Sequence, residues 1–394
     1  MTESLHPQQA ASRGLLRAIS EELGRPVPSE WKDAITAVPR HRFLPERIWL
    51  SDDSGDLEPC DIRSEPDRWF AAAYDNAPVV TQVNDGEEPT DGSDAWPSSS
   101  ASSPAMVVRM LEALDVRPGQ TVLEVGTGTG WNAALLAHRA GPGRVVSIEI
   151  DPAVTWRAHS SLNAAGVDVE VACGDGALGW ARRQPYDRVV STCSVSRVPT
   201  AWIEQTRPGG TIVTPWESPM LSWGLLTLTV EGGRATGRFS PDASFMLMRG
   251  QRIDLRIFRD VVRDNHEPEE STTRLSPWQV SGEDLDARFA LGLKLGDVWT
   301  AWQHEPDAEG VASRLWVATT DARSWAAVDH DDRQEDRFAV RQYGPRRLWT
   351  EIEDAHAWWE KQNRPGPDRF GLRITGEEQL VFLDESTAVI GHVP

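Results

Sequence analysis

A glycine-rich turn follows a short apolar run near the middle of the chain. The run Val122–Val125 has the pattern of a buried strand, and the turn Gly126–Gly130 comes directly after it. Glycine lets a backbone approach a ligand where a Cβ atom would collide. The spacing is GxGxG rather than the GxGxxG of dinucleotide sites, so the turn favours the zwitterionic end of an amino acid over a pyrophosphate.

Two acidic residues follow the next two apolar runs. Glu149 lies 19 residues beyond Gly130, close to the spacing at which an acid binds a ribose diol. Asp175 ends the following run, where an adenine amino group would be received. Each acid alone is also typical of a solvated strand end or an ordinary turn. Because all three elements fall at predicted carboxyl ends of strands, where ligands bind in open α/β sheets, together they predict a nucleoside site.

Strands and helices alternate through the region that holds these residues. The apolar runs that predict strands are 121–125, 144–150, 167–176, 186–192 and 207–216. The segments 131–140 and 152–166, which lie between them, have helical patterns. This alternation predicts a mainly parallel sheet covered by helices on both faces.

Three regions are predicted along the chain: 1–100, 101–235 and 236–394. The first carries helical patterns at 12–23 and from Ser29, a candidate N-cap, and acidic or Ser-rich loops at 51–68 and 84–103. Pro104 suits the first turn of a helix. The third region holds eight of the 18 tryptophans and is predicted to be an α+β domain. Its expected elements are a strand at 314–320, a helix near 346–362 and a closing hairpin at 370–384.

The composition excludes several classes of partner. The formal net charge is −20, and no Lys/Arg cluster is present, so nucleic acid and anionic membranes are poor partners. The three cysteines are far apart and predict neither a disulfide framework nor a metal site. No apolar run is long enough for a membrane span, so we expect a cytoplasmic protein. The sequence does not set the oligomeric state, and a monomer is the simplest expectation.

These blocks resemble class I S-adenosylmethionine-dependent methyltransferases, specifically the protein L-isoaspartyl O-methyltransferase family. VLEVGTGTG and VVSIEID are similar to its first two motifs, and GDG, YDRVVSTCSVSRVP and RPGGTIVTPW follow in its order. Upstream, PRHRFLP resembles a common family segment. Ser98–Met106 resembles the S-x-P-x-M substrate loop, with Ser102, Pro104 and Met106 in register. The resemblance covers about residues 30–230 and implies a Rossmann-like sheet with helices on both faces, followed by the α+β domain.

The resemblance also implies roles for single residues. S-adenosylmethionine would be held by Glu124, Gly126, Thr127, Gly128, Gly130, Glu149, Asp175 and Gly176. Ser100 and Ser102 would contact the substrate carboxylate, with Ser102 as the catalytic residue. Trp216 would line the substrate pocket, although core packing is also typical of a tryptophan there.

The expected reaction needs no general base, because a carboxylate is already ionised at pH 7. His41 is the best histidine candidate, and a surface or helix-end position explains it more simply. The predicted substrate is an Asp or isoaspartate carboxylate in a protein or peptide. Ala101, the long acidic segment 84–97 and the Trp-rich tail depart from the repair enzyme. The tailed chain resembles family members that act on ribosomally made, modified peptides, and this resemblance implies such a peptide as substrate, with aspartimide formation after methylation. Housekeeping repair, a small-molecule substrate and a non-catalytic adaptor are the alternatives.

Overall fold

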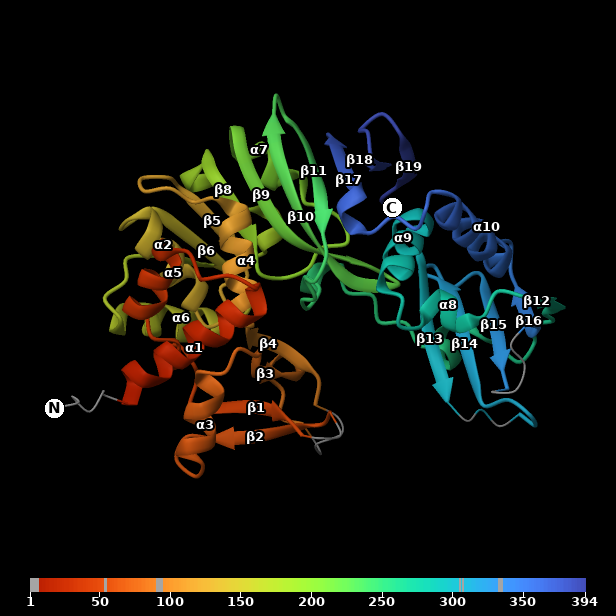
Figure 1. The fold of residues 1–394 in the computed structure, drawn as a ribbon, viewed down its shortest axis with the longest axis horizontal. Helices are drawn as coiled ribbons and strands as arrows, with labels where there is room; N and C mark the ends of the chain where they lie inside the picture. The colour runs from red at the N-terminus through yellow and green to blue at the C-terminus, as the bar shows by residue number, and fades with distance from the viewer. Residues whose placement is uncertain (1–6, 53–54, 90–94, 305, 307, 332–335) are drawn as a thin grey trace. The chain divides into compact units, whose positions relative to one another are not determined.

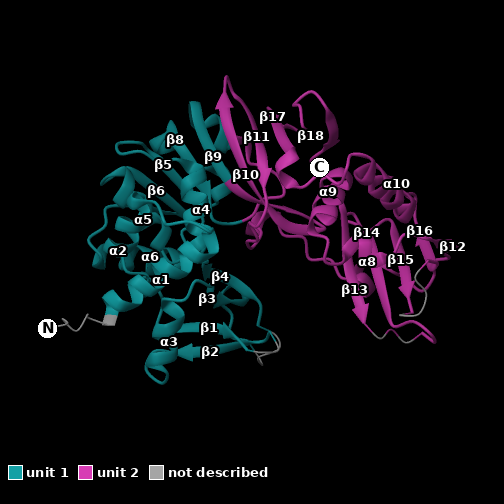
Figure 2. Ribbon diagram, viewed as in Figure 1, with its two compact units in different colours: residues 1–193, 201–213 teal, residues 194–200, 214–394 magenta. Residues whose placement is uncertain are grey.

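A computed structural model describes residues 7–52, 55–89, 95–304, 306, 308–331 and 336–394 (Figure 1). The chain forms two compact units, residues 1–193 with 201–213 and residues 194–200 with 214–394 (Figure 2). The predicted region 1–100 lies in the same unit as the central sheet. The larger segment of the second unit begins at residue 214, earlier than the predicted boundary at 236, because long antiparallel strands precede that boundary.

The first unit is built on a parallel sheet in the order β7-β6-β5-β8, joined by the first part of β9. Its strands are β5 (Val122–Val125), β6 (Val145–Glu149), β7 (Glu170–Cys173), β8 (Tyr186–Ser191) and β9 (Thr206–Ser218). Every residue of β5 and β6 is buried, which explains their nearly continuous apolar runs. The five strands predicted from the alternation are all present.

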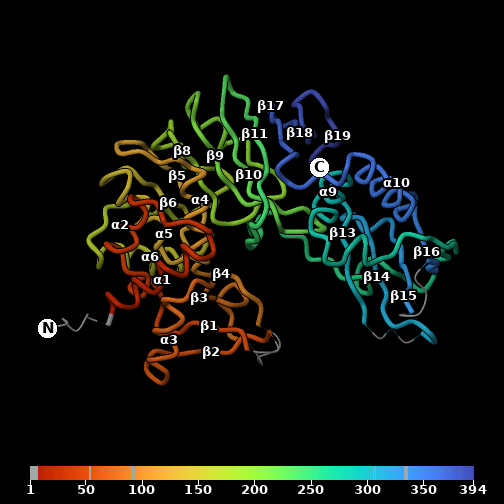
Figure 3. Tube along the Cα trace, viewed as in Figure 1, coloured from red at the N-terminus to blue at the C-terminus, as the bar shows by residue number. Residues whose placement is uncertain are grey.

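Helices pack against this sheet. They are α4 (Pro104–Leu114), α5 (Trp131–Ala140) and α6 (Pro152–Ala164), and the short helix α7 (Thr200–Glu204) precedes β9. The N-terminal helices α1 (Pro7–Leu23) and α2 (Ser29–Ala37) lie against α4 and α5 respectively, as the tube in Figure 3 shows. Ser29 is the first residue of α2 rather than its N-cap, because Pro28 occupies the cap position. Pro104 stands in the first turn of α4, as predicted.

A small sheet of order β2-β1-β3-β4 completes the first unit. Its strands and helix are β1 (Arg47–Ser51), β2 (Leu57–Asp61), α3 (Pro66–Ala73), β3 (Val79–Val83) and β4 (Pro97–Ala101). The predictions of loops at 51–68 and 84–103 were therefore wrong over β2, the start of α3 and β4. Strand β4 was not predicted because its sequence is polar, but it pairs with β3 along one edge. Within the acidic segment 84–97, residues 90–94 lie outside the described ranges.

The second unit contains two antiparallel arrangements of strands. One runs β10 (Leu221–Glu231), β11 (Arg234–Ser240), β17 (Phe370–Thr375), β18 (Glu378–Leu383) and β19 (Val389–His392). The other has the order β12-β16-β15-β14-β13, with bounds Glu269–Thr273, Phe338–Tyr343, Trp325–His330, Ser313–Thr319 and Val298–His304. Strand β14 and the β17–β18 hairpin were predicted.

Three helices complete this unit: α8 (Pro277–Ser281), α9 (Leu285–Leu295) and α10 (Leu348–Lys361), the last of which was predicted. Leu315, Trp349 and Ile352 belong to the apolar core between α10 and the second sheet. Among the described residues, no helix combines the length and the apolar character that crossing a bilayer requires.

Candidate active site

The glycine turn is held in close contact on two sides. Gly126 has a φ of +90°, and a Cβ atom there would lie 2.6 Å from the Thr192 hydroxyl oxygen, which donates a hydrogen bond to the Gly126 carbonyl. Gly128 has a φ of +53°, and a Cβ atom on it would lie 3.5 Å from the Ser100 carbonyl oxygen. The left-handed backbone favours glycine at both positions, and at Gly126 the close Thr192 oxygen also excludes a Cβ atom. The turn therefore lies directly against β4.

A buried polar network supports the turn from beneath. The Glu124 carboxyl is fully buried and accepts hydrogen bonds from the Ser147 hydroxyl and from Asn132 Nδ2, the latter at 2.7 Å. The Thr127 and Ser147 hydroxyl oxygens lie 2.6 Å apart. The side chains of Glu124 and Thr127 are thus committed to the protein interior. Their arrangement indicates that they position the turn, and their predicted contact with a cofactor stays a prediction.

Burial gives Glu124 an unusual protonation behaviour. Desolvation raises the pKa of its carboxyl from 4.5 to about 7, against the opposing hydrogen bonds from Ser147 and Asn132. The folded protein therefore binds the Glu124 proton more tightly than the unfolded chain does. The resulting contribution to the free energy of unfolding is complete at pH values below the carboxyl pKa of the unfolded chain. That stability is lost as the pH rises through about 7.

We therefore expect Glu124→Gln to remove a pH-dependent part of the stability. The free energy of unfolding of the wild type should fall by about 3 kcal/mol more than that of the variant between about pH 5 and about pH 8. Chemical denaturation of both proteins at several pH values measures the difference. Parallel pH profiles of the two proteins would show that Glu124 stays ionised in the fold.

Glu149 is fixed at the end of β6 beside the turn. Its Oε2 accepts a hydrogen bond from the Gly128 N–H at 3.0 Å, and its Oε1 accepts one from the Asp151 N–H at 3.1 Å. Each carboxylate oxygen has a further lone pair beyond these bonds. The side chain is held rigidly and still has acceptor capacity for a ligand diol.

Asp175 follows the adjacent strand. One of its carboxylate oxygens accepts a hydrogen bond from the Ala177 N–H at 2.9 Å, and the residue is exposed. The Gly176 carbonyl beside it accepts a hydrogen bond from the Trp202 indole at 2.8 Å. Because β6 lies between β5 and β7 in parallel register, the structure brings the glycine turn, Glu149 and Asp175 to neighbouring strand ends.

Apolar side chains are exposed at the same edge of the sheet. Ile150, directly after Glu149, is 43% exposed, and Leu178, close to Asp175, is 69% exposed. Exposed large apolar side chains beside polar groups are typical of a ligand surface. The sequence reasoning did not single out either residue.

The serine segment is an ordered strand tied to the end of β6. The Ser98 hydroxyl donates to Gln82 Oε1 at 3.0 Å, and Gln82 Nε2 donates to Asp151 Oδ2 at 3.0 Å. Within the described ranges, the hydroxyls of Ser100 and Ser102 make no hydrogen bond to the protein, and both residues are half-buried. Their hydroxyls are therefore available to a substrate.

Arg40 positions the serine segment, a role that the sequence reasoning missed. Its guanidinium is almost fully buried and donates to the backbone carbonyls of Ala73, Asp75, Ala77, Ala101 and Ser102. Desolvation lowers the pKa of Arg40 to about 10, so the group is still charged at neutral pH. The only feature of the sequence that pointed to Arg40 was its place in the PRHRFLP segment. Arg40 joins α3 and the following loop to the backbone of Ser102.

Arg40→Lys is expected to lower both stability and turnover. A lysine ammonium has three donors and lacks the planar fork, so it cannot satisfy five carbonyls. Loss of these bonds should cost about 3 kcal/mol of stability. Thermal unfolding and initial rates measure the two effects. Arg42→Lys, at an exposed position of the same segment, is the matched control, and equal behaviour of the two variants would contradict the positioning role.

Two further predicted residues have other surroundings. His41 Nδ1 lies 2.7 Å from the Tyr74 hydroxyl oxygen, the ring packs against Phe70 and Tyr74, and desolvation lowers its pKa. These contacts agree with a structural histidine. Trp216 belongs to the second unit, where its indole lines a cavity. Its contact with the substrate stays a prediction.

Comparison with known proteins gives the family. The family model described as Protein-L-isoaspartate(D-aspartate) O-methyltransferase matches residues 66–222. Protein-L-isoaspartate O-methyltransferase 2 of Archaeoglobus fulgidus is 33% identical over 221 residues, which are 56% of this chain and 84% of that protein. This chain belongs to the protein-L-isoaspartate O-methyltransferase family. A family member from Methanopyrus kandleri is 36% identical over 186 residues, 46% of this chain and 67% of its own length.

A solved structure extends the likeness in fold. The structure of a protein-L-isoaspartate O-methyltransferase aligns with 95% of this chain and 100% of its own, with a TM-score of 0.54 and 19% identity. The likeness shows the fold alone, but it includes most of the second unit. The Trp-rich tail was expected to separate this chain from family members with the repair activity. The fold of this region therefore does not separate the chain from that protein, and the role of the region stays a prediction.

As a member of this family, the chain is a methyltransferase that uses S-adenosylmethionine. The residues of the first unit fit this cofactor. Gly126 and Gly128 permit a close approach of the backbone, Glu149 has acceptor capacity, and Ile150 exposes an apolar surface.

Proposed function

We propose that this protein transfers the methyl group of S-adenosylmethionine to the free carboxylate of isoaspartate in a protein or peptide. The single observation that supports it most is the meeting of the glycine turn, Glu149 and Asp175 at adjacent strand ends, directly against the serine strand β4. The names of the relatives favour isoaspartate as the acceptor.

Each part of the site has a role in binding the cofactor. The backbone of Gly126–Gly130 would hold the amino-acid end, and Glu149 would accept hydrogen bonds from the ribose hydroxyls. Asp175 would accept one from the adenine amino group, while Ile150 and Leu178 offer apolar surface to the base. When bound, the cofactor supplies an electrophilic methyl group on a positively charged sulfur.

The chain's own contribution to the reaction is positioning and the exclusion of water. The Ser100 and Ser102 hydroxyls would donate charge-assisted hydrogen bonds to one carboxylate oxygen and orient the other. That oxygen would accept the methyl group that the bound cofactor supplies, and the electron pair of the broken carbon–sulfur bond would stay on sulfur. No proton moves, which agrees with the structural surroundings of His41.

An aspartate in a ribosomally made peptide is the second candidate, with cyclisation of its methyl ester to an aspartimide. The acidic segment between β3 and β4 favours it, since a long acidic extension beside the serine strand would suit a dedicated basic peptide. The matching substrate would be a precursor peptide with basic residues near the aspartate that accepts the methyl group.

Two synthetic peptides that differ only in isoaspartate against aspartate test the proposal. Incubation with S-adenosylmethionine should add the mass of one CH2 group to the isoaspartyl peptide, and a peptide with alanine at this position should stay unchanged. Methylation of the aspartyl peptide alone, or loss of methanol from its methyl ester to leave a peptide one water lighter than the starting peptide, would favour the second candidate. If neither peptide gains mass with an enzyme that binds S-adenosylhomocysteine, the proposal is wrong.

A further inference from the structure

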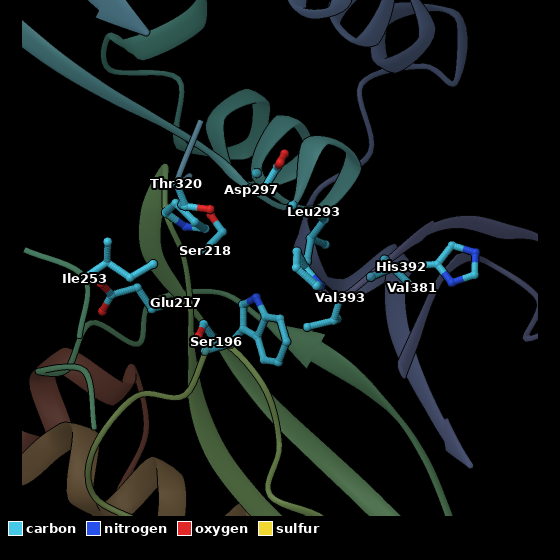
Figure 4. Close-up of a pocket in the computed structure, with 15 residues that line it drawn as sticks. Ser196, Glu217, Ser218, Ile253, Leu293, Asp297, Thr320, Val381, His392 and Val393 are labelled. Carbon is cyan, nitrogen blue, oxygen red and sulfur yellow. The ribbon is translucent and has the colours of Figure 1, made fainter. Parts of the chain in front are cut away.

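The second unit contains a cavity of about 170 Å³ that the proposed reaction does not use (Figure 4). Its walls come from β9 and the turn after it, α9, β18 and the end of the chain, all within this unit. In Figure 4, Ile253 and Glu217 lie on the left of the view, and Leu293 and Val393 lie to their right. The residues that line it include Trp216, Glu217, Ile253, Leu293, Val381 and Val393.

Trp216 contributes a hydrogen-bond donor that has no acceptor. The residue is 3% exposed, and its buried indole nitrogen has no hydrogen-bond partner among the described residues. The ring is held by an edge contact with Phe239, with ring centroids 5.6 Å apart. A buried unpaired N–H group costs about 1–3 kcal/mol and needs an explanation in a folded protein. An acceptor on a bound ligand would supply the missing bond.

Glu217 contributes a carboxyl group with restricted hydration. Burial raises the pKa of its side chain, against a hydrogen bond from Ser222 that lowers it. Asp297, which also lines the wall, is already paired with Arg346 at 2.7 Å. The Glu217 carboxyl can accept a hydrogen bond from a ligand N–H group. The two acidic residues in the wall, in a chain of net charge −20, disfavour an anionic ligand.

The size and the apolar walls limit the ligand further. An apolar cavity of roughly 150 Å³ accommodates a benzene-sized group, whereas sites for whole cofactors are usually larger than about 300 Å³. Leu293 and Val381 are buried aliphatic walls, and Ile253 is 55% exposed. The cavity therefore suits one apolar side chain together with an adjoining group that both accepts and donates hydrogen bonds.

We propose that this cavity binds one leucine-sized side chain of a polypeptide substrate. The backbone carbonyl of that residue would accept from the Trp216 indole, and a backbone N–H would donate to Glu217. The inference rests on the proposed function, because a polypeptide is then the substrate. A second contact away from the reacting carboxylate would raise the affinity for long substrates without new contacts at the reaction centre.

Three small probes test the chemistry of the cavity without any methylation. N-acetyl-leucinamide should bind with a Kd on the order of 1 mM, measured by saturation-transfer NMR. N-acetyl-glycinamide lacks the side chain, and N-acetyl-leucine carries a carboxylate, so both should bind at least about fivefold more weakly. Equal binding of all three probes, or no binding of the leucinamide, would overturn the proposal.

Two variants locate the binding. Val393→Phe should fill the cavity and abolish binding of N-acetyl-leucinamide, whereas Val389→Phe adds the same ring at a position that is 40% exposed on β19 and should not. Trp216→Phe should weaken binding about fivefold, because it removes the unpaired donor. Unchanged binding in Val393→Phe or in Trp216→Phe would show that the probe lies elsewhere or that water satisfies the indole.

Kinetics separate this inference from the proposed function. Val393→Phe should leave kcat and KM for a short isoaspartyl peptide unchanged and raise KM for a long isoaspartyl protein several-fold. An unchanged KM for the long substrate would overturn the inference and leave the proposed function intact. Failure of the wild type to methylate either substrate would overturn the proposed function, while the probe titrations would still report on the cavity.

Discussion

Replacing Glu149 by alanine is expected to weaken the binding of S-adenosylhomocysteine by about 100-fold, because hydrogen bonds to a charged acceptor contribute about 1.5–3 kcal/mol each. The carboxylate is held by the Gly128 and Asp151 N–H groups and would accept two ribose hydroxyls. Its loss also frees the Gly128 N–H, which loosens the turn. Isothermal titration calorimetry with S-adenosylhomocysteine measures the affinity.

Two further substitutions control for this effect. Glu170→Ala removes an exposed acid at the other end of the neighbouring strand β7 and should leave the affinity unchanged. Glu149→Gln keeps the size of the side chain and should give an intermediate loss. An affinity of Glu149→Ala within about twofold of the wild type, in a protein with a normal melting temperature, would contradict the assigned role.

Ser102→Ala is expected to lower kcat by about 10- to 100-fold while the affinity for S-adenosylhomocysteine stays within about twofold. The hydroxyl would donate a charge-assisted hydrogen bond that orients the substrate carboxylate, and nothing else in the described part of the chain uses it. Initial rates at saturating cofactor, together with calorimetry, separate the two effects.

Ser103→Ala is the matched control for this prediction. Its hydroxyl donates to the Asn76 carbonyl at 3.2 Å, so its loss should affect stability slightly and kcat very little. If Ser102→Ala lowered turnover and cofactor affinity equally, the serine segment would have a folding role. An equal fall in kcat for both variants would likewise remove the special role of Ser102.

The sequence predicted the parts of the fold that local pattern determines. The runs that became β5 and β6 are apolar at nearly every position because both faces of these strands are buried. The spacing of Glu149 from the glycine turn follows from the length of one helix between two strands. These features are local, and they predicted that the glycine turn, Glu149 and Asp175 follow neighbouring parallel strands.

Long-range contacts explain most of what the sequence did not predict. Arg40 acts on Ala101 and Ser102, which are 61 and 62 residues away, and a buried arginine cannot be distinguished from an exposed one by composition. Strand β4 has the composition of a linker, and its order comes from long-range contacts: pairing with β3 and hydrogen bonds through Gln82 to Asp151. Similarly, Glu124 has the spacing of a ligand residue, but its burial commits it to the protein interior.

The central claim is that the cofactor lies across the ends of β5, β6 and β7. A crystal structure with S-adenosylhomocysteine tests it most directly. The account predicts both ribose hydroxyls within hydrogen-bond distance of the Glu149 carboxylate, the adenine between Ile150 and Leu178 beside Asp175, and the sulfur facing Ser102. Density for the nucleoside at another place, or a ribose turned away from Glu149, would contradict it.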